Sequence, residues 1–166
     1  MSSFYEKAPV IDSVISNEQT AFIQGRQILD GPLMLSEIIG WFKKKKKNLL
    51  VFKVDFEKAF DSVDWHYIDF MLLQMGFGDK WRRWIKACLS SARTSILVNC
   101  SPTSEFSIRS GLRQGDPLSP FLFIIVIEGL HLALKDAVAN NLIKGVSIGL
   151  LNISHFLFAD DVAIIS

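Results

Sequence analysis

Hydrophobic residues recur along the chain with two different periods, and each period predicts a different type of element. After Pro32, apolar side chains at helical spacing predict a helix that ends at the lysine run Lys43–Lys47. Between positions 49 and 56 the period becomes two, which predicts a strand with Lys53 and Asp55 on one face and Phe52 on the other.

Two amphipathic helices are predicted next, separated by Gly76, Phe77 and Gly78. We expect both apolar stripes to be buried, and we interpret Trp81 and Trp84 as core residues in preference to a base-stacking platform. Apolar segments at 96–98 and 106–108 flank Ser101 and Pro102, which predicts a β-hairpin with a loop longer than two residues.

A long buried helix is predicted from the apolar run after residue 120. Asp116 or Ser119 can cap it, and it should end at about Ala139. Short β-like segments follow at 146–148, 155–159 and 162–165. The mixture of helices and strands predicts an α+β fold in a single domain, with a small antiparallel sheet packed on helices.

The amino-acid composition limits the number of domains and the class of protein, but it does not identify a function. The 166 residues are 49% hydrophobic, enough for one sizeable core. The mean hydropathy of +0.28 is high, so we expect some apolar surface to face a segment outside this chain. No signal peptide or membrane-spanning run is evident, so we expect an intracellular protein, and the nucleus is compatible with that.

The net charge of +1 and the cysteines say little about partners. Cys88 and Cys100 have neither disulfide-framework nor zinc-ligand spacing, and we expect both to lie in the core. The lysines at 43–47 could line a nucleic-acid backbone, but a solvated helix end explains them better.

Three aspartates are the candidate chemistry. Asp160 and Asp161 stand between the apolar runs HFLF and VAII, which predicts a hairpin with the acidic pair at its turn. The pair can be a cation site or an ordinary solvated turn. Asp55 interrupts an apolar strand, where a buried carboxylate needs a compensating cation. The cation can be a metal ion or the ammonium of Lys53. Alternatively, the end of the strand reaches solvent and the carboxylate needs no partner.

Four blocks of the sequence, taken in order, resemble the reverse transcriptases of non-LTR retrotransposons. Three are similar to successive palm motifs: VFKVDFEKAFDSVDW, SILVNCSPTSEFSIRSGLRQGDPLSP and SHFLFADDVAIIS. The upstream ISNEQTAFIQGRQILDG is similar to a block of the fingers. The resemblance covers nearly the whole chain, and an ordered set is far more specific than any one tetrapeptide.

The resemblance implies a polymerase right hand. Residues 1–47 would be partial fingers and residues 48–166 the palm with an interspersed fingers hairpin, whereas the thumb and the other retroelement domains would be absent. It also implies that Asp55, Asp160 and Asp161 are catalytic and bind two Mg²⁺ ions, with Mn²⁺ as a substitute. Asp55 and Asp160 would contribute most of the coordination.

The resemblance also assigns substrate contacts. Phe60 would lie against the sugar of a deoxynucleotide and exclude a 2′-hydroxyl, or alternatively be a core aromatic. The nucleotide would be contacted by Arg113, Gln114 and Gly115. The template or primer would be contacted by Gly111 and Arg26. Alternatively, the glycine-rich segment only forms the cap and turn that precede the long helix. The expected partners are an RNA template, a DNA primer and deoxynucleoside triphosphates.

The function implied is RNA-directed DNA polymerisation by a two-metal-ion mechanism. Because the thumb would be missing, we expect this chain alone to extend primers poorly or not at all. The alternative is a catalytically inactive, truncated relic that retains at most nucleic-acid binding.

Overall fold

The computed structural model describes residues 15–16, 19, 30–149, 151–158 and 160–166. Contacts divide the chain into two compact units, one formed by Met1–Glu57 with Ile127–Ser166 and the other by Lys58–Val126.

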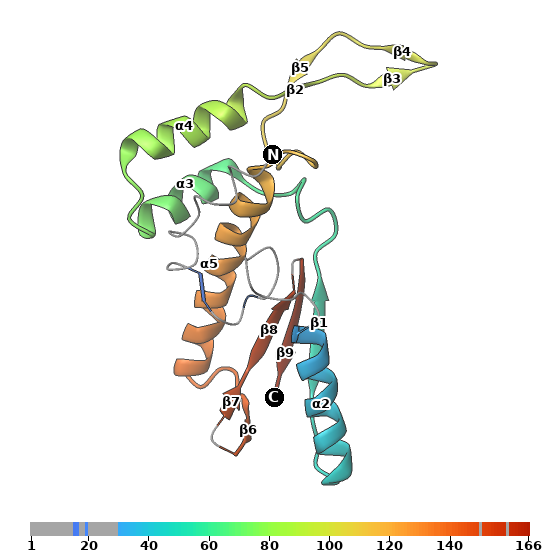
Figure 1. Ribbon diagram of the computed structural model, residues 1–166, viewed down its shortest axis with the longest axis vertical. Helices are drawn as coiled ribbons and strands as arrows, with labels where there is room; N and C mark the ends of the chain where they lie inside the picture. The colour runs from blue at the N-terminus through green and yellow to red at the C-terminus, as the bar shows by residue number, and fades with distance from the viewer. Residues whose placement is uncertain (1–14, 17–18, 20–29, 150, 159) are drawn as a thin grey trace. The chain divides into compact units, whose positions relative to one another are not determined.

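The first unit is organised around a three-stranded antiparallel sheet. Its strands are β1 (Val51–Asp55), β8 (His155–Phe158) and β9 (Asp161–Ile165), in the order β1-β9-β8 (Figure 1). The register pairs Val51 with Ile165 and Asp55 with Asp161. The strand predicted for positions 49–56 is confirmed over Val51–Asp55, but its predicted apolar face is not buried, since Phe52 is exposed. Strand β9 pairs with β1 and β8, which are far apart in the sequence.

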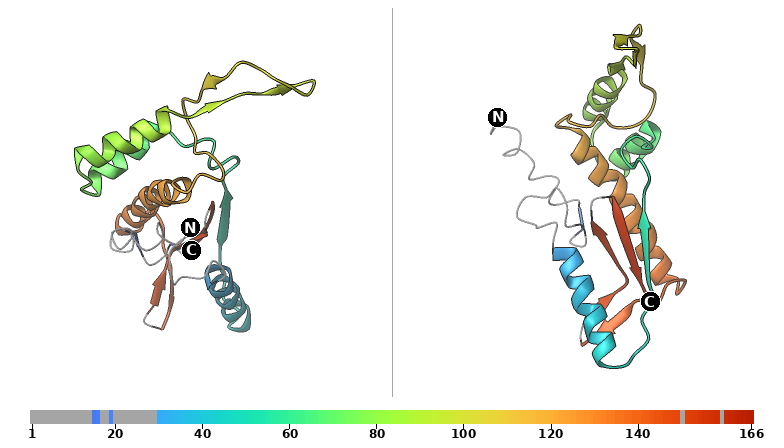
Figure 2. Two further views of the ribbon diagram at one scale, coloured as in Figure 1. Left: turned by 45° about the horizontal axis from the view of Figure 1, so that its top comes forward. Right: turned by 90° about the vertical axis from the view of Figure 1, so that its right-hand side faces the viewer.

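Helix α2 (Asp30–Lys44) packs on one face of this sheet (Figure 2). The helix contributes Ile38 and Phe42, and they pack against alternate residues of the two C-terminal strands. The buried members of this core are Ile38, Phe42, Val146, Phe156, Phe158, Ala163 and Ile165. Lys43 and Lys44 lie exposed in the last turn, where basic side chains favour the helix dipole, as the sequence predicted.

The opposite face of β8 meets helix α5 (Ser119–Ala139), the long buried helix that the sequence predicted. His131 of α5 and His155 of β8 are both buried, with Nδ1 of His131 at 2.8 Å from Nε2 of His155. The buried carboxylate of Glu128 accepts hydrogen bonds from the backbone N–H and the hydroxyl of Ser16. The unit is completed by a hairpin of β6 (Val146–Ile148) and β7 (Leu151–Ile153).

The second unit contains helices α3 (Trp65–Gln74) and α4 (Asp79–Ser90). Asp64 caps α3 by accepting the N–H of His66. Gly76 has φ of +81° between the helices, a conformation that glycine adopts without penalty. Arg82 of α4 makes two hydrogen bonds to the carboxylate of Asp69 on α3, at 2.8 and 2.6 Å.

The predicted hairpin is present but its turn differs. Strands β2 (Arg93–Thr94) and β5 (Phe106–Ser107) form its base, and β3 (Leu97–Val98) and β4 (Ser101–Pro102) form its tip. Ser101 pairs with Val98, so the turn is the two residues Asn99 and Cys100, both at positive φ. The expectation of a longer loop was wrong because Pro102 still fits an edge strand of so short a pair.

Four residues that were predicted to be buried are exposed. Trp81 and Trp84 are 43% and 54% exposed, and both Cys88 and Cys100 are exposed. Only Ile85 of α4 is buried, because α4 packs within the second unit through a narrow part of its apolar stripe. The two tryptophan rings contact each other edge to face, and the ammonium of Lys80 lies over Trp84.

The α+β class with a small antiparallel sheet packed on helices is confirmed. The division into fingers and palm stays a prediction. Within the described residues, no helix combines the length and apolarity that crossing a membrane requires.

Candidate active site

Asp55 and Asp161 face each other across adjacent strands. Asp55 is the last residue of β1 and Asp161 the first of β9, and the two are directly opposed in the antiparallel register. Opposed residues of an antiparallel pair project from the same face, with their Cβ atoms roughly 4.5–5.5 Å apart. Two carboxylates in this arrangement repel each other unless a cation lies near them.

Asp160 lies in the turn that precedes β9 and is exposed. The predicted hairpin with the acidic pair at its turn is therefore confirmed for Asp160, whereas Asp161 already belongs to the strand. Successive side chains of a strand alternate between its faces, but a turn residue is free of this constraint. The turn therefore permits Asp160 to orient independently of Asp161.

The cation near the pair is Lys53. Its ammonium lies 3.0 Å from Oδ2 of Asp161, and the side chains are 61% and 32% exposed. The hydrogen bond to Asp161 and its charge raise the pKa of Lys53 above the ordinary value, and the charges of Asp55 and Asp160 raise it further. The sequence had offered Lys53 as a partner for Asp55; the structure pairs it with Asp161 instead.

Hard oxygen ligands of this kind suit a divalent ion such as Mg²⁺. Asp55, Asp160 and Asp161 all act electrostatically on the ammonium of Lys53, so their carboxylates already favour a positive charge at one place. In the described part of the chain, no three Asp, Glu, His or Cys side chains lie close enough together to hold a metal as they stand. The donor chemistry fits a metal, and binding would require the carboxylates to move closer together.

Phe60 belongs to the second unit and is half-buried. Its ring stacks on Phe123 of α5, with centroids 4.4 Å apart and an interplanar angle of 13°. Its backbone carbonyl accepts the N–H of Leu112. Phe60 therefore makes the contacts of a packed aromatic residue and is only partly exposed.

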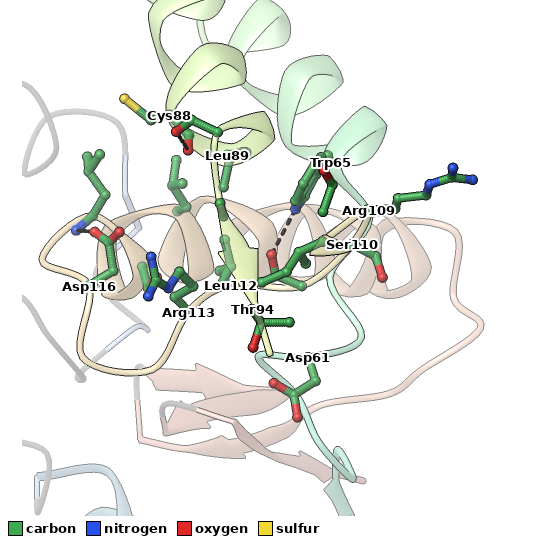
Figure 3. Close-up of a pocket in the computed structure, with 18 of the residues that line it drawn as sticks. Asp61, Trp65, Cys88, Leu89, Thr94, Arg109, Ser110, Leu112, Arg113 and Asp116 are labelled. Carbon is green, nitrogen blue, oxygen red and sulfur yellow. Dashed lines mark hydrogen bonds between the residues drawn. The ribbon is translucent and has the colours of Figure 1, made fainter. Parts of the chain in front are cut away.

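Gly111 is held tightly against the segment that follows β1. Its N–H donates to the carbonyl of Val63, and its own carbonyl accepts from Nε1 of Trp65 at 2.8 Å (Figure 3). Gly111 has φ of +82°, and a Cβ there would lie 2.7 Å from the carbonyl oxygen of Asp61. Only glycine fits this position without displacing backbone atoms.

The glycine-rich segment after the hairpin lines a pocket of about 900 Å³. Gly111, Arg113 and Gln114 lie on its wall, together with Asp61 and residues of α4 and the hairpin base (Figure 3). Arg113 and Gln114 are exposed and can reach a ligand there. Gly115 has φ of +85° and open space around it, which is the turn that the alternative interpretation required.

The predicted site residues thus fall into two groups. Asp55, Asp160 and Asp161 belong to the first unit, and Phe60, Gly111 and the residues at 113–115 belong to the second. Arg26 lies outside the described residues. Sequence reasoning missed Trp65 as the residue that anchors the Gly111 carbonyl; its position at the end of the first palm-like block was the available signal.

The comparisons with known proteins agree with these features. The family model described as reverse transcriptase (RNA-dependent DNA polymerase) matches residues 2–166. A Pol polyprotein from the type-1 retrotransposable element R2 of Popillia japonica is 33% identical over 147 residues, which cover 86% of this chain and 20% of that protein. An uncharacterised 149 kDa protein of transposon TX1 from Xenopus laevis is 27% identical, over 95% of this chain and 12% of its own length.

Among solved structures, apo telomerase from Candida tropicalis has a similar fold. The TM-score is 0.57 with 13% sequence identity, and the match covers 82% of this chain and 28% of the telomerase chain. The chain thus spans about a fifth or less of the length of the R2 and TX1 proteins.

Proposed function

This chain belongs to the reverse transcriptase family, and on that premise we propose that it carries the nucleotidyl-transfer site of an RNA-directed DNA polymerase. The observation that best supports the proposal is the direct opposition of Asp55 and Asp161 on adjacent strands, with a cation lying against Asp161. Two such carboxylates, with a third in the turn, would form a donor set for a divalent metal ion once they move closer together.

Reverse transcriptases generally use divalent metal ions. Asp55, Asp160 and Asp161 would hold Mg²⁺, or Mn²⁺ as a substitute, and the bound ions would supply activation of the primer 3′-hydroxyl and neutralisation of the triphosphate. No side chain of the protein is then needed as a nucleophile. The carboxylates bind and orient, and the rigid sheet holds two of them in register.

The remaining residues would select and position the substrates. Phe60, whose ring stacks on Phe123, would exclude a 2′-hydroxyl. Arg113 offers a guanidinium to phosphate oxygens, and Gln114 offers an amide to a base edge. Gly111 lies on the wall of the pocket that the template strand would approach, and Arg26 would contact template or nucleotide.

The test is primer extension on an RNA template with a DNA primer, deoxynucleotides and Mg²⁺. We expect Asp55→Asn and Asp160→Asn to reduce the weak extension of the unaltered chain to background, and Asp161→Asn to reduce it less. Asp136→Asn is the matched control, because Asp136 is an exposed carboxylate on α5 outside the candidate site. Extension that survives Asp55→Asn would refute the assignment.

Substrate selection can be tested in the same assay. Replacing Phe60 by Val should raise the incorporation of ribonucleotides relative to deoxynucleotides, whereas the aspartate variants should reduce both equally. Binding of primer–template without any extension by the unaltered chain would instead support the alternative function, an inactive relic that binds nucleic acid.

A further inference from the structure

We propose that Lys53 is an internal counter-ion of the aspartate site, which occupies Asp161 in the absence of metal and must release it before a divalent cation binds. The ligand concerned is the divalent cation itself. The inference rests on the proposed function, because it takes Asp55, Asp160 and Asp161 to be the metal ligands.

The sheet geometry supports this role. Lys53 and Asp55 are two residues apart on β1, so their side chains project from the same face. Asp161 opposes Asp55, and Lys53 opposes Ala163, so the ammonium reaches Asp161 diagonally across the strand pair.

Electrostatic attraction explains why the ammonium of Lys53 lies against Asp161. A lysine side chain is an ammonium ion at neutral pH, and that of Lys53 lies 3.0 Å from Oδ2 of Asp161. The lysine therefore changes partner and does not lose a proton when metal binds. A divalent ion carries twice the charge of an ammonium and accepts several oxygen ligands, so it can displace the lysine once its concentration is sufficient.

The competing explanation is a purely structural lysine. β1 is an edge strand of its sheet, and exposed lysines commonly protect such edges from pairing with other chains. That role needs a positive charge but no particular partner. It predicts no change in metal affinity when the ion pair with Asp161 is removed.

The experiment is calorimetric titration of Mn²⁺ and Mg²⁺ into the nucleotide-free chain. Lys53→Gln should lower the dissociation constant roughly two- to fivefold, the factor that corresponds to losing one exposed ion pair. Lys135→Gln, which removes an exposed lysine of α5, should leave the constant unchanged. Lys53→Arg keeps the charge and should leave it unchanged or raise it. Circular dichroism of each variant checks that the fold is retained.

A double-mutant cycle separates the ion pair from a general effect of charge. In the Asp161→Asn background, Lys53→Gln should improve metal affinity by a smaller factor than in the unaltered chain. Equal factors in both backgrounds, or a Lys53→Gln variant that binds metal no better than the unaltered chain, would overturn the counter-ion role.

The outcomes distinguish this inference from the proposed function. If metal binds and Asp55→Asn abolishes it while Lys53→Gln has no effect, the metal site stands and only the counter-ion role fails. If metal binding is absent, or is unaffected by Asp55→Asn and Asp161→Asn, then the metal assignment fails and the counter-ion role fails with it.

Discussion

The close contact at Gly111 gives a prediction whose size can be worked from the structure. In Gly111→Ala, the new methyl group meets the carbonyl oxygen of Asp61 at 2.7 Å and its Cα at 3.0 Å. Both are backbone atoms, so the contact cannot be relieved by rotating a side chain. Overpacking of this kind costs about 1–3 kcal/mol. The left-handed backbone at φ +82° adds about 1–2 kcal/mol for any residue with a Cβ.

Gly115 supplies the matched control. Its φ is +85°, nearly the same, but no atom lies within 4 Å of the Cβ that alanine would add. Gly115→Ala should therefore cost only the backbone term, about 1–2 kcal/mol. Both variants replace a glycine by alanine, so the loss of conformational entropy in the unfolded chain is the same and cancels in the comparison. Gly111→Ala should lower the free energy of unfolding by about 1–3 kcal/mol more than Gly115→Ala.

The assay is urea unfolding followed by tryptophan fluorescence, with the free energy obtained by linear extrapolation. Trp65 hydrogen-bonds the Gly111 carbonyl and reports directly on this segment. Equal losses of unfolding free energy in the two variants would refute the reasoning, because they would mean that the Asp61 backbone can move away from the new methyl group without cost. In primer extension, we expect Gly111→Ala to reduce activity more than Gly115→Ala.

Three further predictions concern stability. Gly31→Ala should lower the free energy of unfolding by about 1–3 kcal/mol, because the added Cβ would overlap the ring of Phe158. Gly40→Ala in the same helix meets no atom and should raise the free energy of unfolding by up to about 1 kcal/mol. Thermal unfolding measures both changes. Trp65→Phe should cost about 0.5–1.5 kcal/mol through its lost hydrogen bond, and no loss in urea unfolding would contradict that contact. The hydrogen bond from Arg82, and secondly the charge of Arg82, hold the pKa of Asp69 below its ordinary value of 3.8. The ion pair should therefore stabilise the fold above pH 3.8, and this stabilisation should be lost as the pH falls through the lowered pKa. Asp69→Asn should flatten this acid dependence, and an unchanged pH profile would count against it.

The sequence alone predicted most of the local structure and the candidate chemistry. Periodicity located α2, β1, α3, α4 and α5, because apolar spacing follows directly from helix and strand geometry. The order of the motifs indicated the family, which the comparisons then showed. Local patterns were enough for these conclusions because each depends on residues close together in the chain.

Patterns of burial were less reliable, because burial depends on what packs against an element. Trp81, Trp84 and Cys88 share an apolar stripe that predicts a core, yet only Ile85 of that helix is buried. Periodicity identifies a face of α4 but does not show how much of that face another element covers. In the hairpin, Pro102 suggested a loop, and only the strand register revealed the two-residue turn at positions 99 and 100.

Tertiary structure also decided how the aspartates are arranged. In the sequence, Asp55 lay next to one candidate cation, Lys53, and far from Asp161. The strand order β1-β9-β8 opposes the two carboxylates and turns Lys53 toward Asp161. Residues on β1 and β9, distant in the chain, meet through strand pairing, and the pattern of one strand does not identify which strand lies beside it. The sequence thus determined which residues carry the candidate chemistry, and the sheet decided which of them face one another.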